Sequence, residues 1–241
     1  MNYSQYLSEL YAAFNQNGLA HLINDDSAQK LYDLSDILIQ TNKTFNLTAI
    51  TDEKEIILKH FVDCASVCDY IPPSAKLIDV GCGAGFPSLP IAILRPDVSV
   101  TPLDSTGKKV DFINLTAKKL KLTNINAICA RAEEFASAHR EQFDVCTSRA
   151  VARLNILDEL CAPLIKKGGL FIAMKSSKGE EEYAEARVGL EKLGCVLQEN
   201  VKKSFAYNKT AIERDIYVFQ KAAATPAQFP RKYAQILKKP L

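Results

Sequence analysis

Apolar residues recur at helical spacing in the first part of the chain. Three such sets lie within residues 7–14, 31–38 and 56–67, and each places its apolar side chains on one face of a helix. A Pro-Pro-Ser sequence at 72–74 then interrupts the pattern, because proline cannot continue a helix. We therefore expect a helical N-terminal extension over residues 1–73.

After residue 74, short apolar runs alternate with helical patterns. Strands are predicted at 76–80, 98–103, 125–130, 143–147, 169–175, 195–203 and 212–220, and helices at 86–94, 107–121, 154–165 and 180–193. This alternation is typical of an α/β domain with a mostly parallel sheet covered on both faces. Only a polar loop at 204–210 separates the last two strands, which predicts an antiparallel hairpin at the sheet edge. We expect one α/β domain over 74–221 and a basic tail over 222–241.

A glycine-rich segment follows the first predicted strand. Gly81, Gly83 and Gly85 stand at alternate positions, and the next predicted strand leads to Asp104, 23 residues after Gly81. Glycines there allow a sharp turn and a close approach of the backbone to a ligand. An acid roughly 20 residues further on suits the hydroxyl pair of a ribose. The pattern predicts a nucleoside-cofactor site.

The spacing of these glycines distinguishes between two kinds of cofactor. The dinucleotide fingerprint has its third glycine three residues after the second, and that position holds Phe86. The G-x-G-x-G spacing is instead similar to the first motif of the S-adenosylmethionine (SAM) methyltransferases. A nicotinamide-dependent oxidoreductase is the alternative, and Phe86 argues against it.

Further candidates follow the third and fourth predicted strands. Ala132 and Glu133 come after the third strand, and Arg149 comes after the fourth. Ligands of open α/β sheets bind beyond the carboxyl ends of the strands. We therefore expect Ala132 and Glu133 beside an adenine and Arg149 at the catalytic rim. The structural alternatives are a helix N-terminal acid for Glu133 and a salt bridge for Arg149.

Composition narrows the class of protein. The 241 residues are 47% hydrophobic and 24% charged, as is ordinary for a globular protein. No apolar run reaches the roughly 18 residues of a membrane span, and the first residues do not form a signal peptide, so we expect a cytoplasmic protein without a membrane segment. The seven cysteines are scattered and lack zinc spacing, which predicts reduced thiols and no metal site.

Charge is unevenly distributed, although the net charge is only +2. Residues 1–76 carry 5 Lys or Arg and 10 Asp or Glu, whereas residues 77–241 carry 25 and 18. The tail carries cations together with Phe229 and Tyr233 and has no acid. Charge runs are usually solvated faces, but a segment of this composition also suits phosphates and stacked bases. Nucleic acid is therefore a plausible partner.

Several motifs give the chain a specific resemblance. They are LIDVGCGAGFP at 77–87, LDSTGKK at 103–109, RAEE at 131–134, FDVCTSRAVA at 143–152, FNLTAI at 45–50, KHFVD at 59–63, TPAQFPRK at 225–232 and KKPL at 238–241. In these segments the chain resembles the bacterial glucose-inhibited division protein B family, which comprises the small-subunit ribosomal RNA methyltransferase G enzymes. It departs from the family pattern at Ser88, at Ser176-Ser177 and at 233–237.

The resemblance implies a seven-stranded, Rossmann-like SAM-dependent methyltransferase that acts on N7 of a guanine in the 530 loop of 16S ribosomal RNA. The cofactor contacts it implies are Gly81, Phe86, Ala132, Glu133 and Arg149, with Asp104 on the ribose and with Gly83 and Gly85 in the same loop. The RNA contacts it implies are Lys59, His60, Arg231 and Lys232. The partner would be 16S rRNA or a precursor of the small ribosomal subunit, and we expect a monomer. For Lys59 and His60 the alternative is packing against the sheet domain.

We assign no general base. The N7 atom of guanine keeps an in-plane lone pair at neutral pH, so its attack on a methyl group needs alignment rather than deprotonation. Arg149 and His60 are the candidates for holding the base or its phosphate. Two competing hypotheses stay open: a ribosome-associated binding protein that kept the cofactor pocket, and a methyltransferase with a different acceptor, such as a small molecule.

Overall fold

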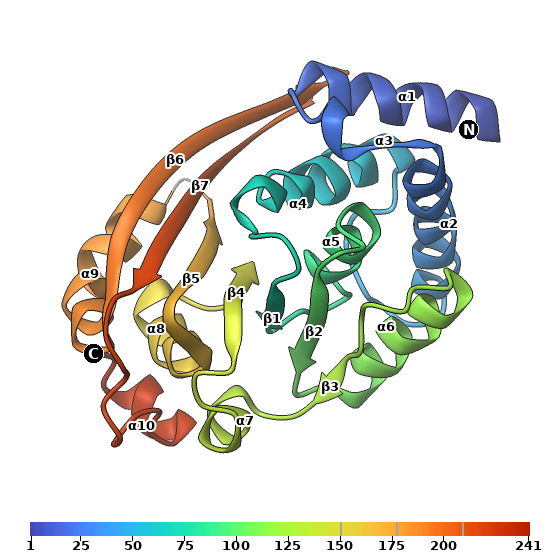
Figure 1. Ribbon diagram of the computed structural model, residues 1–241. Helices are drawn as coiled ribbons and strands as arrows, with labels where there is room; N and C mark the ends of the chain where they lie inside the picture. Colours follow the sequence, from blue (N-terminus) through green and yellow to red (C-terminus); the bar gives the residue numbers. More distant parts are fainter. Residues whose placement is uncertain (150, 177, 209) are drawn as a thin grey trace.

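A seven-stranded sheet runs through the centre of the protein (Figure 1). The computed structural model describes residues 1–149, 151–176, 178–208 and 210–241. Ala150 of the 143–152 motif, Ser177 and Lys209 of the predicted 204–210 loop therefore lie outside the described residues. The strands are β1 (Lys76–Val80), β2 (Ser99–Asp104), β3 (Ile128–Cys129), β4 (Phe143–Arg149), β5 (Ile165–Lys175), β6 (Cys195–Tyr207) and β7 (Thr210–Lys221).

The order of the strands is β3-β2-β1-β4-β5-β7-β6. The first five strands of this order are parallel, and β7 runs antiparallel to both β5 and β6. The strand order reverses beside β1, because β2 lies on one side of it and β4 on the other. This topology confirms the predicted seven-stranded α/β fold with an antiparallel hairpin at its edge. Open sheets of this kind bind ligands in the crevice beyond the carboxyl ends of the strands where the order reverses. The topology therefore predicts a ligand site beyond the ends of β1 and β4.

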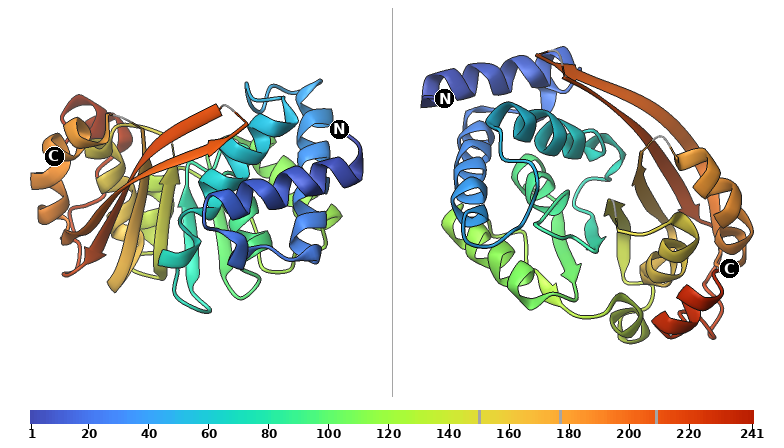
Figure 2. Two further views of the ribbon diagram at one scale, coloured as in Figure 1. Left: turned by 90° about the horizontal axis from the view of Figure 1, so that it is seen from above. Right: turned by 180° about the vertical axis from the view of Figure 1, so that it is seen from behind.

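Different helices cover the two faces of the sheet (Figure 2). Successive side chains of a strand point to opposite faces, so Leu77 and Val145 belong to one core and Ile78 and Cys146 to the other. The first face carries α1 (Tyr3–Gln16), α2 (Asp25–Asn42), α3 (Glu53–Ile56), α4 (Asp63–Ala65), α5 (Ser88–Leu94) and α6 (Gly107–Lys119). The second face carries α7 (Ala132–Ala138), α8 (Leu154–Cys161), α9 (Gly179–Lys192) and α10 (Tyr233–Lys238). Short 3-10 turns lie at Ala20–Leu22, Cys68–Tyr70 and Ala162–Leu164.

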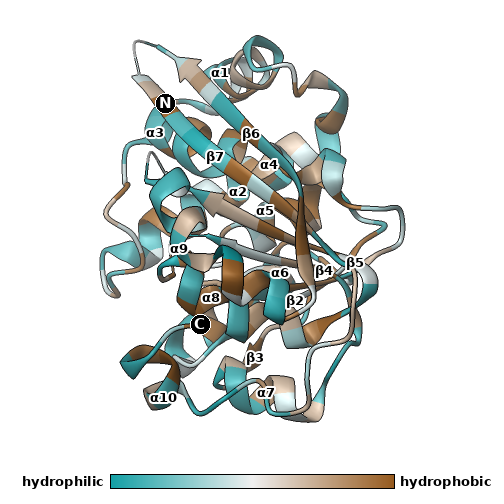
Figure 3. Cartoon of the chain, turned by 90° about the vertical axis from the view of Figure 1, so that its left-hand side faces the viewer, coloured by the Kyte–Doolittle hydropathy of each residue, from teal (hydrophilic) through white to brown (hydrophobic). Residues whose placement is uncertain are grey.

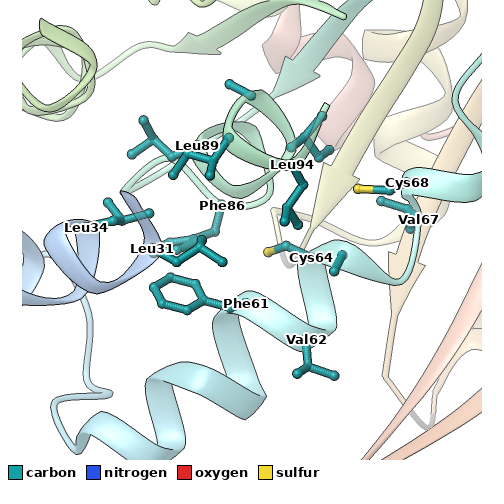
Figure 4. Packing of buried hydrophobic residues seen from close by; sticks show 14 of the residues in the cluster. Leu31, Leu34, Phe61, Val62, Cys64, Val67, Cys68, Phe86, Leu89 and Leu94 are labelled. Atoms are coloured by element: carbon teal, nitrogen blue, oxygen red, sulfur yellow. The ribbon is translucent and has the colours of Figure 1, made fainter. Parts of the chain in front are cut away.

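The helical N-terminal region shares one core with the sheet domain. Leu31 and Leu34 of α2 lie beside Phe61 and face Phe86 and Leu89, and all five side chains are buried (Figure 4). Burial of a large apolar side chain stabilises a fold by about 1.5 to 3 kcal/mol. The extension is therefore held rigidly beside the loop that follows β1.

A π-helical turn, Ile57–Val62, joins α3 to α4. It carries Lys59 and His60, and His60 is 5% exposed. Such turns widen a helix by one residue and are frequent at functional sites. Here the turn directs His60 toward the sheet domain, where its ring stacks on Phe86 with a centroid distance of 4.1 Å.

The prediction of a polar loop at 204–210 is wrong. β6 continues to Tyr207 and pairs there with Thr210 at the start of β7. The tip of this long hairpin reaches α1 (Figures 1 and 2), where Glu9 accepts hydrogen bonds from the Tyr207 hydroxyl at 2.5 Å and the Asn208 amide at 2.7 Å. Contacts with a distant helix thus extend strands whose own sequence is polar.

Three other boundaries differ from the prediction by three residues or more. The third strand is only Ile128–Cys129, and the preceding residues form a single bridge between Val100 and Ile125. The helix predicted at 154–165 ends at Cys161, since a 3-10 turn containing Pro163 follows it. As a result β5 begins early, at Ile165.

Two helices were not predicted. α7 has seven residues and α10 has six, so neither repeats the helical period often enough to stand out in the sequence. Both lie beside the second face of the sheet (Figure 1). Their positions matter for the site, because they border the same cavity.

Hydrophobic and hydrophilic segments are arranged as in a globular domain. Hydrophobic colour gathers in the inner strands, whereas the outer helix α9 is largely hydrophilic (Figure 3). Within the described ranges, no helix is both long and apolar enough to cross a membrane.

Candidate functional site

The loop after β1 has left-handed backbone at each of its three glycines, Gly81, Gly83 and Gly85. Gly81 has a φ of +73°, and a Cβ there would lie 2.5 Å from a methyl carbon of Val151. Gly83 has a φ of +57°, and a Cβ there would have no described atom within 4 Å. Left-handed backbone of this kind disfavours other residues. The loop thus packs tightly at Gly81 and leaves open space beside Gly83.

Asp104 at the end of β2 closes this loop. Its carboxylate accepts hydrogen bonds from the backbone N–H of Gly83 at 3.0 Å and of Thr106 at 2.9 Å. An ionised carboxylate has about four acceptor positions, so two backbone donors leave room for two more. A carboxylate fixed in this way fits the pair of hydroxyl groups of a ribose.

A cavity of about 450 Å³ lies beyond the carboxyl ends of the strands. Its walls include eight of the residues predicted for the site: Gly81, Gly83, Phe86, Asp104, Ala132, Glu133, Arg149 and His60. The size is within the range of small-molecule sites. We call it the cofactor cavity, because the ribose-type carboxylate and the glycine loop both open into it.

The other predicted residues lie elsewhere. Gly85 faces Leu89 and Ile113, where a Cβ would come within 2.6 Å of Leu89. Arg231 and Lys232 do not belong to the described walls of the cofactor cavity. Lys59 borders a second cavity, next to the first.

That second cavity has a volume of about 470 Å³. It shares His60, Arg149 and Val151 with the cofactor cavity, so the two meet at these side chains. Four cations line it, Lys59, Arg149, Lys175 and Arg214, together with one acid, Glu182, which pairs with Lys175 at 2.8 Å. We call it the cationic cavity.

A buried carboxylate orders the boundary between the two cavities. Asp63 is fully buried and accepts hydrogen bonds from Arg149 Nη1 at 2.9 Å and from Arg214 Nε at 2.9 Å. Arg149 also donates to the backbone oxygen of Lys59 at 3.1 Å. Arg149 therefore has the salt bridge that was its structural alternative, and it also lines both cavities.

His60 is held in a neutral form. A guanidinium can only donate hydrogen bonds, so His60 Nδ1, 3.3 Å from Arg149 Nη2, must accept. His60 Nε2 then carries the proton and donates to Thr48 Oγ1 at 3.3 Å. Burial and the charge of Arg149 lower the pKa of His60 to about 3. The lone pair on His60 Nδ1 already accepts this hydrogen bond from Arg149, so His60 is a poor general base.

Asp79 of β1 connects the residues on either side of the glycine loop to the neighbouring strand β4 through hydrogen bonds. It is fully buried and accepts hydrogen bonds from the hydroxyls of Ser88 and Thr147. Burial raises the pKa of Asp79 to about 6. Ser88, one of the departures from the family pattern, thus fastens the start of α5 to the end of β1.

Several polar or aromatic residues that line the two cavities were not predicted as site residues, among them Thr48, Lys175, Arg214 and Tyr233. Thr48 lines the cofactor cavity. It lies in the FNLTAI motif, which contributed to the family resemblance but did not indicate Thr48 as a site residue. Lys175 and Arg214 stand in β5 and β7, and a cation in a sheet strand was the available signal. Tyr233 of the tail lines the cofactor cavity, whereas its sequence context had suggested stacking on bases of a nucleic acid.

The cysteines, which all lie within the described ranges, form no disulfide bond. All seven cysteines are free thiols, and only Cys129 is exposed. The part of the chain that the structure describes contains no group of three or more His, Cys, Asp or Glu side chains that could hold a metal ion.

Comparison with known sequences identifies the family of the chain. Residues 27–211 match the family described as rRNA small subunit methyltransferase G (GidB). The chain is 42% identical over 224 residues to the ribosomal RNA small subunit methyltransferase G of Staphylococcus carnosus (strain TM300), covering 91% of this chain and 92% of that protein. It is 43% identical over 214 residues to the protein of the same name from Listeria monocytogenes serovar 1/2a, covering 87% and 89%.

Among solved structures, the fold is similar to that of TYW2 from M. jannaschii, which was solved in complex with AdoMet. The TM-score is 0.53 at 15% sequence identity, over 66% of this chain and 74% of that one. At this identity the likeness concerns the fold.

Proposed function

The chain belongs to the rRNA small subunit methyltransferase G family, and from that premise we propose that it methylates N7 of a guanine in the 530 loop of 16S rRNA. The family predicted from the sequence motifs is confirmed by the match over residues 27–211 and by relatives more than 40% identical over most of the chain. The protein is a SAM-dependent methyltransferase of ribosomal RNA.

We place SAM in the cofactor cavity. Asp104 would hold the ribose, the loop at 81–86 would face the methionine part, and Ala132 and Glu133 would border the adenine. The open space beside Gly83 and the two free acceptor positions of Asp104 support this placement. Gly85 would support the loop from behind rather than touch the cofactor, because it faces Leu89 and Ile113.

The cationic cavity is the observation that carries the proposal. It adjoins the cofactor cavity through His60 and Arg149, and its lysine and arginine lining suits a phosphorylated nucleotide. A guanine nucleotide turned out of its loop would enter there, as enzymes that modify a base take it out of its stack. Lys59 and His60 are then the RNA-side residues at the reaction centre.

The chemistry needs little from the protein beyond alignment. Bound SAM supplies an electrophilic methyl group, which the N7 lone pair of guanine can accept without loss of a proton. His60 is neutral and hydrogen-bonded on both ring nitrogens, and Arg149 is fixed by Asp63. These residues hold the shape of the passage between the cavities, and rigid alignment of two reactants is itself a large rate factor.

The tail holds the other two RNA candidates, Arg231 and Lys232. The Arg231 guanidinium is bound to Glu159 at 2.6 Å, whereas the side chain of Lys232 is exposed. We propose that Lys232 contributes to RNA binding at the surface. We also propose that the protein acts as a cytoplasmic monomer, and that its substrate is 16S rRNA or a precursor of the small subunit.

The test uses 16S rRNA and small subunits from a host strain that lacks the gene. Incubation with the protein and SAM labelled in the methyl group is expected to add a borohydride–aniline cleavage site in the 530 loop. Label at another nucleotide, or at a position that does not cleave, would reject the proposed acceptor. Naked RNA and intact subunits, compared in parallel, identify the substrate form.

Lys59→Gln tests the cationic cavity in the same assay. We expect a higher KM for RNA and an unchanged Kd for SAM, because Lys59 lines the cationic cavity and does not line the cofactor cavity. Lys30→Gln is the matched control, since both lysines form an ion pair with an acid four residues earlier. Equal RNA kinetics in the two variants would reject the assignment of Lys59.

A further inference from the structure

We propose that Tyr233 of the C-terminal tail forms the wall of the cofactor cavity against which the adenine of SAM lies. This inference rests on the proposed placement of SAM in that cavity. It gives the tail a role in binding the cofactor, in addition to the RNA contacts expected from its charge.

Tyr233 lies at the end of the cavity that the adenine would occupy. Tyr233 lines the cavity together with Ala132 and Glu133 of α7. α10, which begins at Tyr233, lies beside α7 and away from the turn between α3 and α4 that carries His60 (Figure 1). The guanidinium carbon of Arg131 lies 5.7 Å from the centre of its ring. The ring is half-buried and packs against the core of the second sheet face. An aromatic ring that packs partly against the core and also lines a cavity suits a flat base.

An ion pair holds the tail in this position. Two residues before Tyr233, the backbone N–H and the guanidinium of Arg231 both donate to Glu159 of α8, at 2.6 and 2.9 Å. The Glu159 side chain is fully buried, so loss of Arg231 would leave a charge without its partner in the interior. The pair fixes the backbone directly before α10.

Further contacts anchor the tail on both sides of that pair. Arg140 donates to the backbone oxygens of Thr225 and Phe229. Phe229 is 4% exposed, and Ile236 of α10 is fully buried. Phe229 therefore cannot stack on an RNA base as the sequence suggested, since its ring lies in the core. Tyr233 is the aromatic residue of the tail that borders a cavity.

Titration calorimetry with the purified full chain tests the proposal, with S-adenosylhomocysteine and adenosine as probes. For Tyr233→Ala we expect the Kd of both probes to rise by about tenfold, a usual effect of removing an aromatic ring from a base. Tyr233→Phe keeps the ring and should bind like the wild type. Tyr233→Leu keeps the apolar packing but not the aromatic face, and should weaken binding without loss of folding.

Leu237→Ala is the control on the same helix. Leu237 is 50% exposed, and its side chain is not among the cavity walls in the described residues, so both Kd values should stay unchanged. Unchanged Kd values in Tyr233→Ala and Tyr233→Leu would overturn the proposal, including the case in which only the KM for RNA rises.

Asp104→Ala separates this inference from the placement on which it rests. If Asp104→Ala weakens both probes and the Tyr233 variants do not, SAM occupies the cavity and the role of Tyr233 is rejected. If neither position affects binding, the placement of SAM fails and the inference fails with it. Weakening at both positions, with Tyr233→Phe unaffected, supports the inference.

Discussion

Arg149 donates a hydrogen bond of 2.9 Å to the fully buried carboxylate of Asp63. Arg149 ends β4 of the sheet domain, and Asp63 begins α4 of the N-terminal extension. Because Arg149 also lines both cavities, this ion pair connects the extension to the boundary between them. The extension is therefore part of the site as well as part of the core.

Asp63→Asn should destabilise the protein and impair methyl transfer. The change removes the charge shared by Arg149 and Arg214, and disruption of a buried ion pair costs about 3 to 5 kcal/mol. We expect the lower end, since both guanidinium groups are partly exposed. Urea unfolding measures the change, and the rate of methyl transfer is measured under conditions where the variant is folded.

Asp69→Asn is the control for Asp63→Asn. Asp69 pairs with His21 on the surface, and both side chains are more than half exposed, so the loss of this charge should scarcely alter the unfolding midpoint. Equal effects of the two substitutions would contradict the importance of the buried pair.

Gly83→Ala should reduce SAM affinity more than stability. Gly83 and Gly18 both have left-handed backbones, and for each of them a Cβ would have no described atom within 4 Å. Each substitution should therefore cost a similar roughly 1 to 2 kcal/mol of backbone strain. Only Gly83 lines the cofactor cavity, so only Gly83→Ala should raise the Kd for S-adenosylhomocysteine. A comparable loss of affinity in Gly18→Ala would contradict this placement.

His60 should make stability depend on pH. Burial and Arg149 lower its pKa to about 3 in the folded protein, from 6.5 in a free side chain. Between these values the unfolded chain binds a proton that the folded protein does not, so stability falls as pH falls from 6.5 toward 3. The slope from one such group approaches about 1.4 kcal/mol per pH unit.

His60→Gln removes this titration. Urea unfolding of the two proteins at a neutral, a mildly acidic and a more acidic pH gives the difference in stability at each pH, and effects of all other groups largely cancel in that difference. We expect the wild type to lose stability relative to the variant as pH decreases. A difference that is constant with pH would show that His60 titrates normally in the folded protein.

The sheet and the cofactor loop could be predicted because their signals are local. The apolar strand before Gly81, the glycines themselves and Asp104 lie within one strand–helix–strand unit, and the rules that connect them need no distant contact. Four of the eight predicted residues that line the cofactor cavity, Gly81, Gly83, Phe86 and Asp104, belong to this unit. The other four were predicted from the ends of later strands and from the family resemblance. Their individual roles stay predictions until binding is measured.

Long-range partners could not be predicted in this way. Arg149 and Asp63 are 86 residues apart, and Tyr207 and Glu9 are 198 apart. Neither pair leaves a periodic trace in the sequence, because each depends on how whole elements pack. The same is true of Tyr233, which lines the cofactor cavity next to a tail segment that the contact of Arg231 with Glu159, 72 residues away, helps to hold in place.

Glu159→Gln should loosen the tail and thereby weaken SAM binding. The neutral amide cannot replace the ionic hydrogen bonds to Arg231 at 2.6 to 3.0 Å, so trypsin should cleave after Arg231 and Lys232 faster than in the wild type. If the pair acts by placing Tyr233, the combined variant Glu159→Gln/Tyr233→Ala should bind S-adenosylhomocysteine about as weakly as Tyr233→Ala alone. Coupled residues give such non-additive effects, whereas independent ones add. Glu181→Gln is the control: it removes an exposed partner of Arg153 and should change neither the rate of cleavage nor the affinity for S-adenosylhomocysteine. Additive losses of affinity in Glu159→Gln/Tyr233→Ala would show that the ion pair and Tyr233 act separately.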